Sequence, residues 1–70
     1  MMYYYGFPYR PPMSGAQPND GLVITKEIEL VVRGKRLWGF AAYTRELSDD
    51  EQKQYELMPI TADEIVEGVV

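Results

Sequence analysis

The stretch that decides the fold runs from Gly21 to Thr44 and reads GLVITKEIELVVRGKRLWGFAAYT. Within residues 22–32, leucine, isoleucine or valine stands at positions 22, 24, 28, 30 and 32, while Thr25, Glu27 and Glu29 take odd positions. This alternation is typical of a half-buried strand with its even positions facing inward. Residues 37–44 are rich in aromatic and small apolar side chains and predict a second strand. The two strands predict an antiparallel hairpin.

Two registers of this hairpin compete. A two-residue loop that begins at Gly34 suits a type II′ turn and pairs Val32 with Leu37. A three-residue loop, 34–36, pairs Val32 with Trp38 and gathers the apolar side chains on one face. Because a slip of one residue exchanges the two faces of a strand, the apolar pattern favours the three-residue loop. The tighter loop would require cover on both faces of the hairpin.

Residues 1–20 predict an extended or disordered tail rich in tyrosine and proline, and residues 21–70 predict one small domain. Prolines fix the backbone φ and remove amide donors, so neither a helix nor a central strand is expected in the tail. The aromatic density is nevertheless unusual for disorder, which favours a tail that lies against its own domain, a sister subunit or a partner. The candidate tail contacts are Tyr3, Tyr4, Tyr5, Phe7 and Tyr9.

The C-terminal third predicts two short helices. Capping boxes at residues 48–51 and 61–64 indicate helices over about 49–57 and 62–68, with a short strand at 57–60 as an option between them. We therefore expect the α+β class: a small antiparallel hairpin or sheet with two short C-terminal helices and the N-terminal tail. A second subunit or the tail is expected to enlarge the sheet, because a lone hairpin is marginal in water.

The core of such a small domain must be modest, and no cysteine is present to add a disulfide. Association with another copy is the expected compensation, so we predict a homo-oligomer. The residues predicted to form the core are Leu30, Val32, Trp38, Phe40, Tyr55 and Ile65.

Catalysis is poorly supported. The chain has no histidine and no cysteine, which removes the commonest general base, the commonest transition-metal ligand and the thiolate nucleophile. Ser14 and Ser48 thus have no histidine to activate them. We predict no catalytic residue, no cofactor and no metal site. No apolar run reaches bilayer-spanning length and no targeting segment is visible, so the prediction is a cytoplasmic protein without a membrane partner.

Charge is distributed unevenly along the chain, whose net charge is −4. Residues 21–45 carry five basic side chains against two acidic ones, a sum of +3, whereas residues 46–70 carry eight carboxylates against one lysine, a sum of −7. This polarity predicts a charged surface that a partner can recognise. The candidate acidic surface consists of Asp49, Asp50, Glu51, Glu56, Asp63 and Glu64.

The basic counterpart is the predicted hairpin tip, where Arg33, Lys35, Arg36 and Trp38 form a candidate contact for a partner or a nucleic acid. The favoured function is a small non-enzymatic interaction protein that binds or inhibits another macromolecule, most simply another protein, through this bipolar surface. One alternative is nucleotide or nucleic-acid binding by the tip, although the net negative charge opposes it. A further alternative is a structural subunit whose copies are linked by the tyrosine-rich tail.

Overall fold

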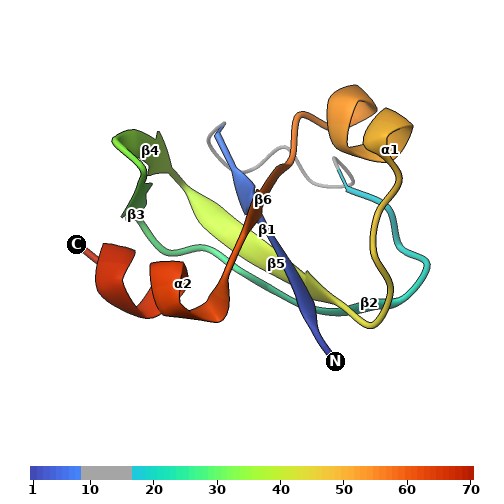
Figure 1. Cartoon of the computed structure of the whole chain (residues 1–70), viewed down its shortest axis with the longest axis horizontal. Helices are drawn as coiled ribbons and strands as arrows, with labels where there is room; N and C mark the ends of the chain where they lie inside the picture. Colours follow the sequence, from blue (N-terminus) through green and yellow to red (C-terminus); the bar gives the residue numbers. More distant parts are fainter. Residues whose placement is uncertain (9–16) are drawn as a thin grey trace.

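The computed structural model describes residues 1–8 and 17–70, and these residues build an α+β fold around a four-stranded antiparallel sheet (Figure 1). The strand order of this sheet is β2-β5-β1-β6, and a separate two-stranded sheet pairs β3 with β4. The predicted fold class is confirmed, with a larger sheet than a single hairpin. The elements are β1 (Tyr3–Phe7), β2 (Leu22–Lys26), β3 (Leu30–Val32), β4 (Lys35–Leu37), β5 (Gly39–Tyr43), α1 (Asp49–Gln54), β6 (Met58–Ile60) and α2 (Ala62–Gly68).

The N-terminus begins with a strand and not with an extended tail, so that part of the predicted fold is wrong. β1 is a central strand, with β5 on one side and β6 on the other. Prolines were expected to prevent this, but the first proline, Pro8, follows the last residue of β1. The expectation that the N-terminal segment enlarges the sheet is confirmed.

The hairpin tip has a two-residue loop, Arg33-Gly34, and both predicted registers are wrong. Val32 pairs with Lys35, and Leu30 pairs with Leu37. Arg33 and Gly34 both have positive φ, 52° and 78°, as a type I′ turn requires. The sequence pattern placed a glycine at the first loop position. In the structure Arg33 takes this position with a positive φ, a conformation that few non-glycine residues adopt.

The two arms of the predicted hairpin run antiparallel, and each arm contributes one strand to each of the two sheets. Their lower halves are β2 and β5, where Thr25 pairs with Ala41, and their upper halves are β3 and β4. Residues 27–29 separate β2 from β3. This break allows the β3–β4 hairpin to fold over one face of the larger sheet, where Leu37 contacts Gly6 of β1.

The sheet is covered on both faces, each with its own hydrophobic cluster. Side chains at odd positions of β1 and β5 pack with leucines that flank α1, and we call this cluster the tyrosine face. The opposite cluster joins the β3–β4 hairpin to β6 and to one side of α2, and we call it the aliphatic face. The buried members of the tyrosine face are Tyr5, Phe7, Ala41, Tyr43, Leu47 and Leu57. Those of the aliphatic face are Leu30, Val32, Leu37 and Ile60.

Gly6 is required where the β3–β4 hairpin crosses β1. A Cβ atom at this position would stand 2.3 Å from Cδ1 of Leu37, whose side chain is fully buried. A side chain at position 6 would therefore require the buried Leu37 side chain, or the hairpin that carries it, to shift. The absence of a side chain at Gly6 allows the hairpin to approach the sheet closely.

Both helices begin as predicted. Ser48 and Glu51 form a reciprocal capping box at α1, and Thr61 and Glu64 form the second at α2. α1 ends at Gln54, three residues before the predicted end, and α2 ends at Gly68 as predicted. β6 lies within the segment where the sequence left a short strand as an option.

The predicted core is correct for Leu30 and Val32, which are buried, and incomplete elsewhere. Phe40, Tyr55 and Ile65 are partly buried against the two clusters, and Trp38 is partly exposed. Ile24, expected on the inward even face, is half exposed. Prediction missed Tyr5, Phe7 and Tyr43 because the tail was not expected to supply a central strand.

Candidate functional site

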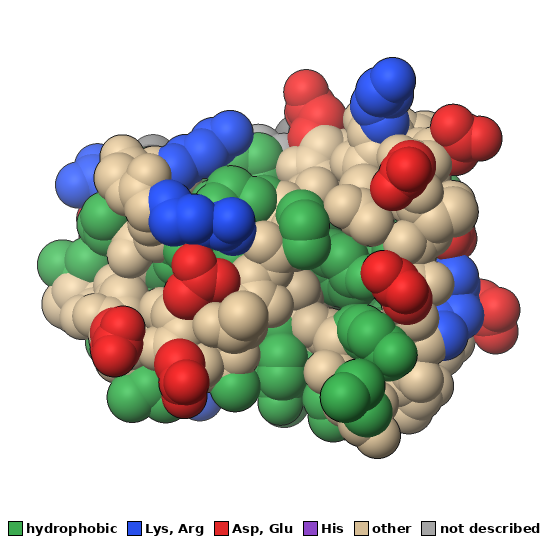
Figure 2. All heavy atoms as spheres, viewed as in Figure 1, with side chains coloured by type: hydrophobic (Ala, Val, Ile, Leu, Met, Phe, Trp, Pro, Cys, Tyr) green, Lys and Arg blue, Asp and Glu red, His purple; other side chains and the backbone are tan. Residues whose placement is uncertain are grey.

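The predicted basic site occupies the β3–β4 hairpin end, beside α2. Figure 2 shows basic side chains gathered over this end of the molecule, with carboxylates of α2 next to them. The tip is exposed: Arg33 and Gly34 form the turn, and Lys35 and Arg36 follow it in β4. The basic hairpin tip and the acidic helix α2, which are separated in the sequence, are therefore neighbours in space.

The two arginines of the tip are held by the chain's own acceptors. Nε of Arg33 lies 3.1 Å from a carboxylate oxygen of Glu64, and its Nη2 donates to the carbonyl oxygen of Pro59 at 2.6 Å. Nε of Arg36 lies 3.0 Å from a carboxylate oxygen of Glu29. These exposed pairs are individually weak, but they reduce the positive field that the tip presents.

Trp38 and Lys35 complete the predicted tip. The guanidinium carbon of Arg36 lies 5.5 Å from the ring centroid of Trp38, a cation–π distance. The Trp38 backbone N–H donates to the carbonyl of Phe7, so the residue joins the tip to β1. Lys35 forms no ion pair with any described residue. The structure thus brings all four predicted residues together. Of the three basic residues at the tip, Arg33 and Arg36 form ion pairs with described residues and Lys35 does not.

The candidate tail contacts have different positions in the sheet. Tyr5 and Phe7 are buried in the tyrosine face, where they form core. Tyr3 is partly buried beside that cluster, and Tyr4 packs against the aliphatic face with its ring edge-on to Phe40. Tyr9, the fifth candidate contact, lies outside the described residues.

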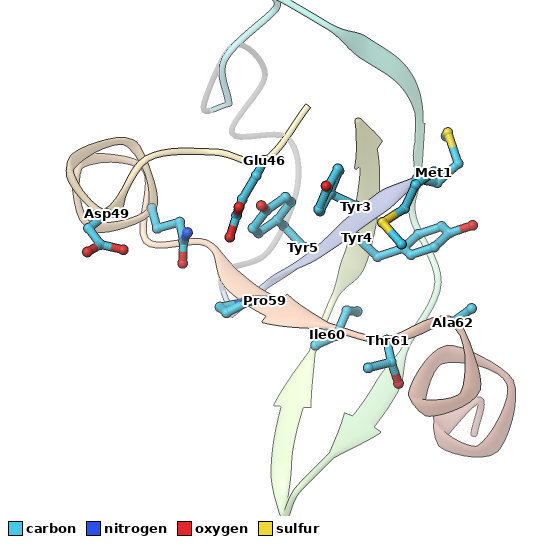
Figure 3. A pocket seen from close by; sticks show the side chains of 12 residues that line it. Met1, Tyr3, Tyr4, Tyr5, Glu46, Asp49, Pro59, Ile60, Thr61 and Ala62 are labelled. Carbon is cyan, nitrogen blue, oxygen red and sulfur yellow. The ribbon is translucent and has the colours of Figure 1, made fainter. Parts of the chain in front are cut away.

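A groove of about 520 Å³ runs along β1 and β6 between the N-terminal ends of the two helices (Figure 3). Its apolar floor comes from β1 and β6, and carboxylates stand at the end near α1. Prediction missed Glu46, Gln52 and the β6 side of this groove, and no local pattern could have revealed them, because β6 meets β1 only in the folded sheet. The lining residues are Met1, Met2, Tyr3, Tyr4, Tyr5, Glu46, Asp49, Gln52, Pro59, Ile60, Thr61 and Ala62.

The candidate acidic surface divides into residues with structural partners and residues without them. Glu51 accepts from the backbone N–H of Ser48 and forms two hydrogen bonds with Arg45, at 2.9 and 2.8 Å. The hydrogen bonds from Arg45, with that from the Ser48 backbone, lower the pKa of Glu51 from 4.5 to about 2. Glu51 also raises the pKa of Arg45 in turn. The Glu51 carboxylate therefore stabilises the fold through these contacts, and the Glu64 carboxylate does the same through its capping box and Arg33.

The remaining predicted acidic residues are Asp49, Asp50, Glu56 and Asp63, and all four are exposed. In the described part of the chain, three of six basic side chains pair with four of eleven carboxylates. Seven carboxylates and three lysines are left without an ion pair among those residues. The field that the molecule presents is consequently acidic, and the basic tip does not reverse it.

Residues 1–8 and 17–70 contain no group of three or more metal-ligating side chains of the His, Cys, Asp or Glu type. No helix there has the length and apolar character needed to cross a membrane.

Comparison with known protein families gives a match over most of the chain. The model of the family described as Defence against restriction A C-terminal (DarA_C) matches residues 1–62. No curated protein and no solved structure matches the chain. Because the match covers 62 of the 70 residues, this chain belongs to the Defence against restriction A C-terminal family.

Proposed function

We propose that this domain is a non-enzymatic interaction module whose acidic, aromatic groove binds a basic surface of another protein, and that this binding serves defence against restriction. The observation that carries the proposal is the position of Glu46 and Asp49. Both carboxylates line the groove, Glu46 beside Tyr5 of β1 and Asp49 at the α1 end (Figure 3), and neither forms an ion pair within the described residues. They are available to a cation from outside.

The chemistry of the groove favours lysine or arginine side chains as its ligands. An entering cation can contact an aromatic face and pair with a carboxylate, and both interactions gain strength as the groove excludes water. Phosphate groups would instead meet Glu46 and Asp49, which repel them. This contrast favours a protein partner over the nucleic acid considered for the hairpin tip.

The family description supplies the context for this partner. Restriction acts on DNA, and a protein that holds DNA neutralises phosphates with lysine and arginine. Such a protein therefore displays a basic surface, which an acidic module can occupy through complementary charge. In this role the domain needs no catalytic residue.

The first experiment measures capture of a partner by the immobilised domain from a lysate of a restricting host. The test variant, Glu46→Gln/Asp49→Asn, removes two charges from the groove with little change in shape. The matched control, Asp63→Asn/Glu67→Gln, removes two charges from exposed positions of α2. We expect the test variant to weaken binding at least about tenfold, equivalent to 1.4 kcal/mol, and the control to retain most of it.

Two results would contradict this assignment. Equal loss in both double variants would show that overall charge, and not the groove, determines binding. Salt-sensitive binding of oligonucleotides that Lys35→Glu abolishes would transfer the function to the hairpin tip. Circular dichroism of each variant ensures that the comparison is made between folded proteins.

The second experiment tests the link to restriction. Unmodified plasmid is transformed into a restricting host and into a non-restricting host, each expressing the domain or its groove variant. We expect the wild-type domain to raise transformation only in the restricting host, and Glu46→Gln/Asp49→Asn to lose this effect. If the domain binds a partner through the groove but does not raise transformation of the restricting host, the groove does not act in defence against restriction.

A further inference from the structure

Both groove carboxylates belong to one short segment at the start of α1. Glu46 lies in the connection between β5 and α1, and Asp49 is the first residue of α1. Both side chains are exposed, and neither forms an ion pair with a described residue. Their positions therefore depend on how the chain around them is held.

A guanidinium–carboxylate pair closes this segment. Nη1 and Nη2 of Arg45 donate to the two carboxylate oxygens of Glu51, at 2.9 and 2.8 Å. The pair spans residues 46–50, and so joins the chain just before Glu46 to the first turn of α1 just after Asp49. Two parallel hydrogen bonds fix orientation as well as distance, which the single point charge of a lysine does not.

The third nitrogen of the Arg45 side chain fixes the pair to the rest of the fold. Nε donates to the carbonyl oxygen of Asp20 at 2.8 Å, in the turn before β2, and the neighbouring Thr44 N–H donates to the Gly21 carbonyl oxygen at 3.0 Å. The side chains of Arg45 and Glu51 are 32% and 28% exposed, compared with 58% and 61% for the arginines of the hairpin tip. Because water screens this pair less, it holds its geometry more firmly than the pairs of the tip.

Leu47, between the two carboxylates, is held by both of its backbone groups. Its N–H donates to the Tyr5 hydroxyl at 2.9 Å, and its carbonyl oxygen accepts from Nε2 of Gln52 at 3.0 Å. Its side chain is buried in the tyrosine face. The segment thus has a fixed inner side at Leu47, while its exposed neighbours Glu46 and Asp49 line the groove (Figure 3).

We infer that Arg45 is a positioning residue, which holds Glu46 and Asp49 where a cationic partner of the groove binds them. This inference rests on the proposed function. It predicts the opposite of what charge alone predicts. Arg45 does not line the groove but places a positive charge near it, so by charge alone its removal would strengthen the binding of a cation. If Arg45 positions the carboxylates, its removal weakens that binding.

The first test measures binding of a fluorescently labelled hexa-arginine peptide by fluorescence anisotropy. Arg45→Lys keeps the charge and loses the paired bonds, and we expect it to weaken binding at least about fivefold. Arg45→Gln removes the charge as well and should weaken binding by at least as much. Lys26→Gln is the matched control. It removes one positive charge from an exposed position of β2, at the sheet edge opposite to β6, and should leave binding unchanged or slightly stronger.

Hydrogen exchange followed by NMR gives a measurement that needs no partner. In Arg45→Lys we expect the Leu47 amide to exchange at least about fivefold faster than in the wild type, while the amides of the β3–β4 hairpin keep their rates. Unchanged exchange at Leu47 would show that Arg45 does not hold the segment. An equal rise at all amides would show a loss of global stability instead of local positioning. Either result would overturn the inference.

The outcomes separate this inference from the proposed function. If Glu46→Gln/Asp49→Asn loses the peptide while Arg45→Lys keeps wild-type affinity, the groove binds cations and Arg45 does not position it. Tighter binding by Arg45→Gln would show that Arg45 acts through its charge alone, which also overturns the inference. If the wild type and Glu46→Gln/Asp49→Asn bind the peptide equally, the proposed function fails and the positioning role fails with it.

Discussion

The two faces of the central sheet are built differently. On the tyrosine face, buried polar atoms are satisfied by specific hydrogen bonds: the Tyr43 hydroxyl donates to the carbonyl of Pro18 at 2.6 Å, and Leu47 N–H donates to the Tyr5 hydroxyl at 2.9 Å. On the aliphatic face, the buried side chains are leucine, valine and isoleucine, which pack without polar atoms. Hydrogen bonds thus stabilise the tyrosine face, whereas close packing of apolar side chains stabilises the aliphatic face.

This difference determines what each face can position. Directed bonds from Tyr5 and Tyr43 hold the chain at Leu47, just before α1, and at Pro18, just before β2. The bond between Tyr5 and Leu47 therefore helps to place the α1 end of the groove. The aliphatic face holds the β3–β4 hairpin, whose arginines pair with neighbouring carboxylates. Substitutions on the two faces should accordingly have different consequences.

The largest effect is expected on the aliphatic face, from Leu37→Ala. Leu37 is fully buried and sits against Gly6, so the truncation removes packing and leaves a cavity between hairpin and sheet. We expect the free energy of unfolding to fall by about 2–5 kcal/mol, measured by urea denaturation. Val66→Ala, at a 77% exposed position, should change it by less than about 0.5 kcal/mol. Similar losses in both variants would show that the hairpin is not packed as described.

A smaller but more specific effect is expected on the tyrosine face, from Tyr5→Phe. The substitution preserves the ring and leaves the Leu47 N–H without its acceptor, which should cost about 1–3 kcal/mol. Tyr3→Phe is the matched control, since the Tyr3 hydroxyl makes no hydrogen bond with the described residues. If the two variants unfold at the same urea concentration, the directed bond does not stabilise this face.

The smallest effect is expected at the surface pair of Arg45 and Glu51, and it depends on pH. The pKa of Glu51 is lowered in the folded chain to about 2 from 4.5, so its contribution to stability is fully present above pH 4.5. That contribution should decline as the pH falls through 4.5 and disappear near pH 2. The measurement is the difference in urea midpoint between the wild type and Glu51→Gln across this range. A difference that stays constant down to pH 2 would exclude the pair as its source.

Local features of the fold were predictable because they depend on nearby residues. Both capping boxes join a hydroxyl and a carboxylate three positions apart, and both helices begin at the expected residues. The inward positions of Leu30 and Val32 follow from alternation along one strand. The turn at Gly34 was located, but its register was not, because Arg33 adopts the left-handed conformation.

The candidate site was less predictable, because its parts come from distant segments. Tip residues Arg33 to Trp38 are close in sequence and were found together. Their neutralisation was not foreseen, since Glu64 lies about thirty residues from Arg33. The groove likewise required β1 to pair with β6, whose partners include Tyr4 with Ile60.

By itself, then, the sequence determined the α+β class, the helix starts, a turn at Gly34 and the absence of cysteine and histidine chemistry. Each of these depends on residue type or on spacings of a few residues. Only the tertiary structure decided that Tyr3–Phe7 is a central strand and that two arginines of the tip are paired. These features arise from contacts between residues far apart in the chain, which no local pattern encodes.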